Sequence, residues 1–157
     1  MKKQDTKCES EGAEFLVLGY LMINKIWAYK TYTNMAGYDL VAVNPESGKN
    51  CKIQVKSRWA TDSNKSFPIK NLECDFVVYI NLNRGFWFNK NKRDDLTGVK
   101  LPDIFVLPIQ IIKEKRDNST FKKVNTKKIE NLENYRENWN LINFKYQAIL
   151  DHFFKIG

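Results

Sequence analysis

The stretch GYDLVAVNPESGKNCKIQVKSRW, residues 37–59, combines two strand-like runs with a turn between them. The turn segment NPESGK, residues 44–49, is rich in residues that favour turns, so the unit is predicted to be a β-hairpin. If the strands pair symmetrically about Glu46 and Ser47, Asp39 lies opposite Gln54. A bulge would shift that register by one residue.

The second strand of this hairpin carries Gln54 and Lys56 two residues apart. Residues two apart on a strand share a face, so the amide and the ammonium point the same way, while Ile53 and Val55 point the other way. A strand wetted on one side is the ordinary explanation of such a pair. A catalytic site is the alternative explanation.

Further elements are predicted on both sides of the hairpin. A helix of about four turns is expected from Ser10, which is a suitable N-cap. Alternating residues after it predict a first strand. Loops are expected where turn-forming and charged residues gather, and three strands are expected later in the chain. The strands are expected at 25–33, 74–83, 84–91 and 103–112, and the loops at 60–71, 92–102 and 113–128.

Two of these strands have distinct character. The run CDFVVYINLN, residues 74–83, is nearly all apolar and is typical of a strand buried on both faces. The run DIFVLPIQII, residues 103–112, contains Pro108, which places it near a sheet edge or a bulge.

The ends of the chain complete the predicted architecture. Residues 1–9 are expected to be flexible, and apolar spacing predicts one or two helices within residues 126–157. The whole chain, 1–157, is expected to form a single domain. The order of helix, strands and helix indicates a mixed α/β fold, in which an N-terminal helix and C-terminal helices flank a central mixed β-sheet.

The charge balance favours a polyanionic partner. The chain has 26 Lys and Arg against 18 Asp and Glu, a formal net charge of +8, and a pI near 9.3. Nucleic acid is the first candidate partner and a membrane surface the second. No basic helix with an aromatic apolar face supports the membrane, and no apolar run of 18 residues or more is present.

Cysteine and histidine usage excludes several kinds of site. The three cysteines have no metal-ligand spacing, and His152 is the single histidine, so a disulfide framework, a Cys/His zinc site and a histidine-based triad are all disfavoured. The N-terminus has no uninterrupted apolar segment of the kind found in a secretory signal. Reduced thiols and a cytoplasmic location are therefore expected.

Three segments together resemble the PD-(D/E)XK nuclease superfamily. They are EGAEFLVLGYL with Glu14, GYDLVAV with Asp39, and KIQVKS with Gln54 and Lys56. The resemblance covers about residues 10–82. Within the superfamily, the sequences of these three segments are most similar to the branches of Holliday-junction resolvases and group I intron homing endonucleases.

The resemblance implies a restriction-endonuclease-like core and metal-dependent hydrolysis of phosphodiester bonds in DNA. Glu14, Asp39 and Gln54 would be ligands of Mg²⁺, which prefers oxygen ligands and which Mn²⁺ can replace. Lys56 would orient the attacking water or stabilise negative charge that develops at phosphorus. No small-molecule cofactor is expected.

Gln54 departs from the pattern, because most members of the superfamily have a second carboxylate at that position. An amide oxygen still ligates a cation but brings one unit less of negative charge. The alternative function is therefore a catalytically inactive module that binds nucleic acid and keeps the nuclease fold. A purely structural or interaction protein is a third possibility, in which the basic surface is incidental.

Basic and polar residues outside the motif are candidates for contact with DNA, because phosphates attract cations and bases stack on aromatic rings. A solvated surface is the competing explanation for these residues. No helix-turn-helix or zinc finger is present, and cleavage of both strands of a duplex would favour a homodimer or higher homo-oligomer. The candidates for DNA contact are Ser57, Arg58, Lys65, Lys70, Arg84, Lys90, Lys92 and Arg93.

Overall fold

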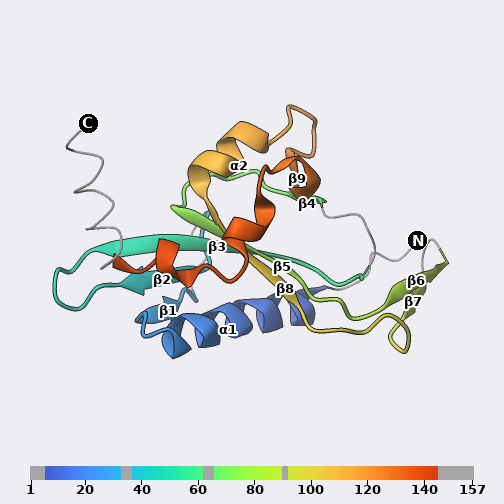
Figure 1. The fold of residues 1–157 in the computed structure, drawn as a ribbon, viewed down its shortest axis with the longest axis horizontal. Helices are drawn as coiled ribbons and strands as arrows, with labels where there is room; N and C mark the ends of the chain where they lie inside the picture. The colour runs from blue at the N-terminus through green and yellow to red at the C-terminus, as the bar shows by residue number, and fades with distance from the viewer. Residues whose placement is uncertain (1–5, 33–36, 62–65, 90–91, 145–157) are drawn as a thin grey trace.

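A computed structural model describes residues 6–32, 37–61, 66–89 and 92–144 of the chain. Its centre is a five-stranded mixed sheet with strand order β1-β2-β3-β5-β8 (Figure 1). β3 and β5 are parallel, and the other neighbouring pairs are antiparallel. The strands are β1 (Ala28–Lys30), β2 (Leu40–Val43), β3 (Asn50–Arg58), β5 (Phe76–Asn81) and β8 (Asp103–Pro108).

The sheet is covered on both faces, which gives the protein two apolar layers. Helix α1 (Lys7–Ile23) packs on one face through Ala13, Val17 and Leu21. Helix α2 (Ile109–Lys115) lies on the other face together with a small sheet formed by β4 (Ser66–Pro68) and β9 (Lys123–Asn125) (Figure 1). The predicted mixed α/β fold with a central mixed sheet and an N-terminal helix is confirmed.

The hairpin has the predicted register. Leu40 pairs with Ile53 and Ala42 pairs with Cys51, which is the register expected for a turn centred on Glu46 and Ser47, and Asp39 directly precedes the first of these pairs. The backbone N–H of Asp39 donates to the carbonyl of Ile53 at 2.9 Å, which continues the pairing past the end of β2. The four pairs from Leu40–Ile53 to Val43–Asn50 are in register without a shift, and Asp39 stands just before them, beside the strand that carries Lys56.

The apolar strand predicted over residues 74–83 is confirmed as β5. All six of its residues are buried, because α1 covers one side and the layer of α2 and β4 covers the other. It lies between β3 and β8, the central place that its composition indicates.

The first helix begins earlier than the sequence pattern indicates. α1 starts at Lys7, with Thr6 at the N-cap, so residues 7–9 are helical rather than part of a flexible end. Ser10 is inside the helix, and its hydroxyl donates to the carbonyl of Thr6 at 3.0 Å instead of capping the first turn.

Pro108 marks a change of element rather than an interruption within one strand. β8 ends at Pro108. The second half of the predicted strand, residues 109–112, belongs to α2 (Ile109–Lys115). Proline suits this position because its fixed φ and missing N–H are compatible with the start of a helix. The prediction of a single strand over 103–112 is wrong in that half.

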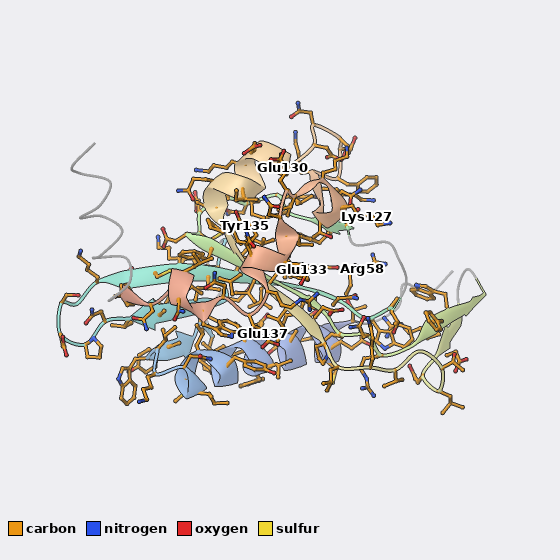
Figure 2. All side chains as sticks on the ribbon, in the orientation of Figure 1. Arg58, Lys127, Glu130, Glu133, Tyr135 and Glu137 are labelled. Atoms are coloured by element: carbon orange, nitrogen blue, oxygen red, sulfur yellow. The ribbon has the colours of Figure 1, made fainter. Side chains whose placement is uncertain are left out.

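Over residues 126–143, the segment predicted to form C-terminal helices contains short 3-10 helices instead of α-helices. They are η1 (Thr126–Lys128), η2 (Leu132–Tyr135) and η3 (Trp139–Leu141), and Figure 2 labels Glu130, Glu133 and Glu137 along this segment. Asn131 and Glu137 have φ of 51° and 45°, a left-handed conformation that stops a regular helix between them. Residues 145–157, including His152, lie outside the described part.

Three short strands occur in or beside segments predicted as loops. β4 and β9 pair with each other, and β7 (Lys92–Asp94) pairs with β6 (Phe86–Asn89), which lies in a predicted strand. The β6–β7 hairpin extends from one end of the molecule near the start of α1 (Figure 1). None of the described helices is long and apolar enough to span a membrane.

Candidate active site

A pocket of about 290 Å³ opens where β2 begins, between the first half of α1, β3 and β4. Three of the four predicted catalytic residues line it, each from a different element. The lining residues are Ser10, Glu14, Asp39, Val55, Lys56, Ser57, Phe67 and Pro68.

Asp39 is held rigidly at this pocket. Its carboxylate Oδ2 accepts a hydrogen bond from the backbone N–H of Val55 at 2.7 Å. Its carbonyl accepts from both the backbone N–H of Thr31 at 2.9 Å and the Thr31 hydroxyl at 3.0 Å. Because Val55 of β3 and Thr31, which follows β1, both anchor this residue, its carboxylate needs little reorganisation to bind a cation.

The turn before Asp39 depends on glycine. Gly37 has φ of +96°, and a Cβ built on it would lie 2.6 Å from Oδ1 of Asn71. That amide oxygen itself accepts from the backbone N–H of Glu73 at 2.8 Å, so it is not free to move away.

Gly37→Ala is therefore expected to lower both stability and activity. The positive φ alone costs about 1–3 kcal/mol for a residue with a side chain, and the contact with Asn71 pushes the turn that carries Asp39. Thermal unfolding and a DNA cleavage assay measure the two effects. Gly19→Ala is the matched control, since a Cβ there meets nothing within 4 Å and alanine favours the helix. Equal stability of the two variants would contradict this account of the turn.

Lys56 is half-buried at the pocket wall. Burial lowers the pKa of its ammonium below the usual value, and the negative charge of Asp39 opposes that shift without cancelling it. The ammonium of such a lysine is poorly hydrated and releases its proton more readily than that of a surface lysine.

Gln54 lies on the same face of β3 as Lys56 but is not among the residues that line the pocket. Its side-chain Oε1 is buried and has no hydrogen-bond partner among the described residues. A buried acceptor without a partner costs about 1–3 kcal/mol. An oxygen in this state fits the role of ligand to a hard cation, which would supply the missing partner.

Glu14 faces the pocket from α1 and also pairs with Lys30 of β1 through Oε2. Burial raises the pKa of its carboxyl, the hydrogen bond with Lys30 opposes the rise, and the charge of Asp39 adds to it. The two carboxylates therefore act on each other electrostatically, and both line the same pocket.

Within the described residues no group of three His, Cys, Asp or Glu side chains is placed to hold a metal ion. A site formed by carboxylates alone is therefore absent from that part of the chain. The available oxygen donors are the carboxylates of Glu14 and Asp39 and the amide of Gln54, a set with few charges. Such a set suits Mg²⁺, which keeps several waters and binds through one or two carboxylates.

The residues predicted to contact DNA are scattered relative to this pocket. Ser57 lines it, while Arg58 ends β3 between the centre of the sheet and the β6–β7 hairpin (Figure 2). Lys70 and Arg84 are exposed. Lys65 and Lys90 lie outside the described residues, and only the backbone of Lys92 is described.

Arg93 has a structural environment that the sequence did not indicate. Its guanidinium pairs with the carboxylate of Glu9 on α1 and stacks over the rings of Trp59 and Trp87, at 4.5 Å and 5.8 Å from their centres. These contacts tie the β6–β7 hairpin to the start of α1 and neutralise the charge. Arg93 is thus a link between elements in this structure.

Sequence reasoning also missed Lys30 and Asn71, which touch Glu14 and the turn before Asp39 respectively. Lys30 lies in the predicted first strand and Asn71 in a predicted loop, and neither position has a local pattern that identifies its partner. Their roles depend on contacts between distant segments.

The arrangement defines a mixed α/β protein in which an acidic residue and a lysine face one pocket from a hairpin. A solved structure with the same fold is that of a bacterial homing endonuclease, I-Ssp6803I, with a TM-score of 0.59 and 19% sequence identity. The match covers 94% of this chain and 99% of that one. No protein-family model and no curated protein matches the sequence.

Proposed function

We propose that this protein is a metal-dependent endonuclease of the PD-(D/E)XK type that hydrolyses phosphodiester bonds in DNA. The observation that carries the proposal is the meeting of Asp39 and Lys56 in one pocket, and the unpartnered amide oxygen of Gln54, two residues before Lys56 on the same face of β3, adds to it. The fold shared with a homing endonuclease over nearly the full length of both chains supports it.

In this proposal Asp39, Gln54 and Glu14 hold Mg²⁺, or Mn²⁺ in its place. The chemistry that a bound divalent cation supplies is polarisation of the phosphate and a lowered pKa of the attacking water. Lys56 orients that water or stabilises negative charge on the phosphate oxygens, and its poor hydration strengthens either interaction. Asp39 is the anchoring ligand, because Val55 fixes its carboxylate.

DNA is the proposed substrate because the chain has a formal charge of +8 and its structural neighbour is a homing endonuclease. Ser57 and Arg58 continue β3 beyond Lys56, and we propose them as contacts to a phosphate next to the scissile one. Lys70 and Arg84 are exposed cations that add to attraction for the backbone. Cleavage of both strands requires two pockets, so the proposal includes a homodimer or higher homo-oligomer. The three free thiols fit a cytoplasmic enzyme.

The test is cleavage of branched, nicked and plain duplex DNA with Mg²⁺, with Mn²⁺, and with a chelator in place of either ion. We expect cleavage that requires the divalent cation and stops when the chelator is added. The alternative, a catalytically inactive module, predicts salt-sensitive DNA binding without cleavage under any of these conditions. If the protein neither cleaves DNA nor binds it at low salt, the remaining possibility is a purely structural or interaction protein.

A further inference from the structure

Lys30 is an almost fully enclosed cation beside the candidate active site. Its side chain is only 6% exposed and pairs with two carboxylates of α1, Glu14 through Oε2 and Glu11 at 3.1 Å. The rings of Phe15 and Tyr32 lie 5.4 Å and 5.9 Å from its ammonium nitrogen. The lysine is therefore held in one place by charge on one side and aromatic faces on the other.

Glu14 belongs to two groups of residues at once. Its carboxylate pairs with Lys30, and it also lines the pocket with Asp39 and Lys56. The contact between Lys30 and Glu14 is made through Oε2 of the carboxylate. One carboxylate thus connects the enclosed cation to the pocket.

The charges around the pocket make this connection significant. Glu11, Glu14 and Asp39 contribute three negative charges and Lys56 one positive charge, and Lys30 cancels half of the remainder. A divalent cation is attracted in proportion to the net negative charge of its ligands. Lys30 therefore lowers the attraction of the pocket for a metal ion, most directly at Glu14.

We infer that Lys30 is a positioning residue that competes with the divalent metal ion for the Glu14 carboxylate, so that the DNA-free protein binds the ion weakly. The inference rests on the proposed function, since it assumes that the pocket is a metal site. It adds that Glu14 is already partnered by a cation and that a DNA phosphate, which brings negative charge to the pocket, increases affinity for the ion. Metal and DNA then bind cooperatively.

The experiment is a titration of Mn²⁺ into the DNA-free protein. Binding is measured by calorimetry and by the electron spin resonance signal of free Mn²⁺. Lys30→Met removes the ammonium and keeps an apolar stem against Phe15 and Tyr32. We expect it to bind Mn²⁺ about ten-fold more tightly than the unmodified chain, which corresponds to about 1.4 kcal/mol. Lys30→Gln is a second variant that keeps a hydrogen-bond donor, and circular dichroism checks that both are folded.

Two controls separate competition at Glu14 from a general effect of charge. Lys49→Met removes one positive charge from the exposed turn of the hairpin and is expected to leave Mn²⁺ affinity unchanged. In a Glu14→Gln background, Lys30→Met is expected to have no effect, because the shared carboxylate is gone. An equal gain in that background would overturn the inference.

The outcomes also distinguish this inference from the proposed function. If the unmodified chain binds Mn²⁺ and Lys30→Met binds it no more tightly, only the role of Lys30 is wrong. If no variant binds Mn²⁺, with or without DNA, and no DNA is cleaved, the proposed function fails and the inference fails with it.

Discussion

Asp39→Asn is expected to reduce metal-dependent DNA cleavage by about 100- to 1,000-fold, because a bound cation provides several kcal/mol of stabilisation and each 1.4 kcal/mol is about ten-fold in rate. Asparagine is close in shape to aspartate, and its amide oxygen can still accept the hydrogen bond from Val55. The substitution therefore removes the charge while the turn before β2 stays in place. Single-turnover cleavage at fixed Mg²⁺ concentration measures the effect.

Asp39→Ala separates the two roles of this carboxylate. Alanine leaves the backbone N–H of Val55 without its acceptor, which adds a stability loss of about 1–3 kcal/mol to the loss of activity. Asp39→Asn should unfold close to the unmodified temperature and Asp39→Ala below it. Glu46→Gln is the matched control, since it neutralises an exposed carboxylate in the turn of the same hairpin. Full activity of both Asp39→Ala and Lys56→Ala would refute the nuclease assignment.

The hairpin could be predicted to the residue because its information is local. A short turn between two strands sets the register, and the register alone brings Asp39, at the start of one strand, beside the strand that carries Gln54 and Lys56. The central strand β5 could equally be predicted, since five apolar residues in a row, Phe76 to Ile80, have few other places in a sheet. In both cases the pattern and the environment are properties of one short segment.

Other elements could not be predicted because competing local signals were similar in strength. Thr6 and Ser10 are both acceptable at the start of a helix, and only packing of α1 decides for the first. The residues on both sides of Pro108 are apolar, so their composition is compatible with either a short helix or a continued strand. Left-handed residues such as Asn131 depend on how the segment after β9 meets the sheet.

The site was predictable only in part for a related reason. Asp39 and Lys56 come from one hairpin, and the sequence brings them together through pairing. Lys30 reaches Glu14 from sixteen residues away along the chain, and Arg93 reaches Glu9 from 84 residues away. Charge partners at such separations follow from tertiary packing, so the sequence predicted Glu14 as a metal ligand and Arg93 as a DNA contact without indicating the ion pairs that both make in the structure.

At Gln54 the sequence and the structure indicate different things about a metal site. From the sequence, an amide in place of a carboxylate weakens the expectation of a metal site. In the structure its oxygen is buried and lacks a partner among the described residues, which is an unfavourable state for an amide with a purely structural role. In the proposed metal site, the neutral amide of Gln54 brings less negative charge than a carboxylate and Lys30 offsets the charge of Glu14, so weak metal affinity without DNA is expected from either.

Lys56→Met is expected to lower the cleavage rate and raise stability at neutral pH. Removal of a positioned acid–base or charge-stabilising group costs about 100- to 10,000-fold in rate. Methionine has a similar length without the charge, and burial is the main cause of the lowered pKa of Lys56. The variant no longer keeps a partly buried ammonium in poorly hydrated surroundings, so its unfolding temperature should rise while its activity falls.

The sign of the pH dependence provides a second measurement of the same substitution. The pKa of Lys56 is lower in the folded chain than in the unfolded chain, where it is near 10.5. Between those two values the unfolded state binds more protons, so the stability of the unmodified protein rises with pH in that interval. The stability gained by Lys56→Met should be largest below the folded pKa and should shrink as pH rises toward 10.5. Lys49→Met, at an exposed lysine of the same hairpin, should give no such trend. If the difference between Lys56→Met and the unmodified chain is constant with pH, Lys56 is not the poorly hydrated cation that the proposed mechanism requires.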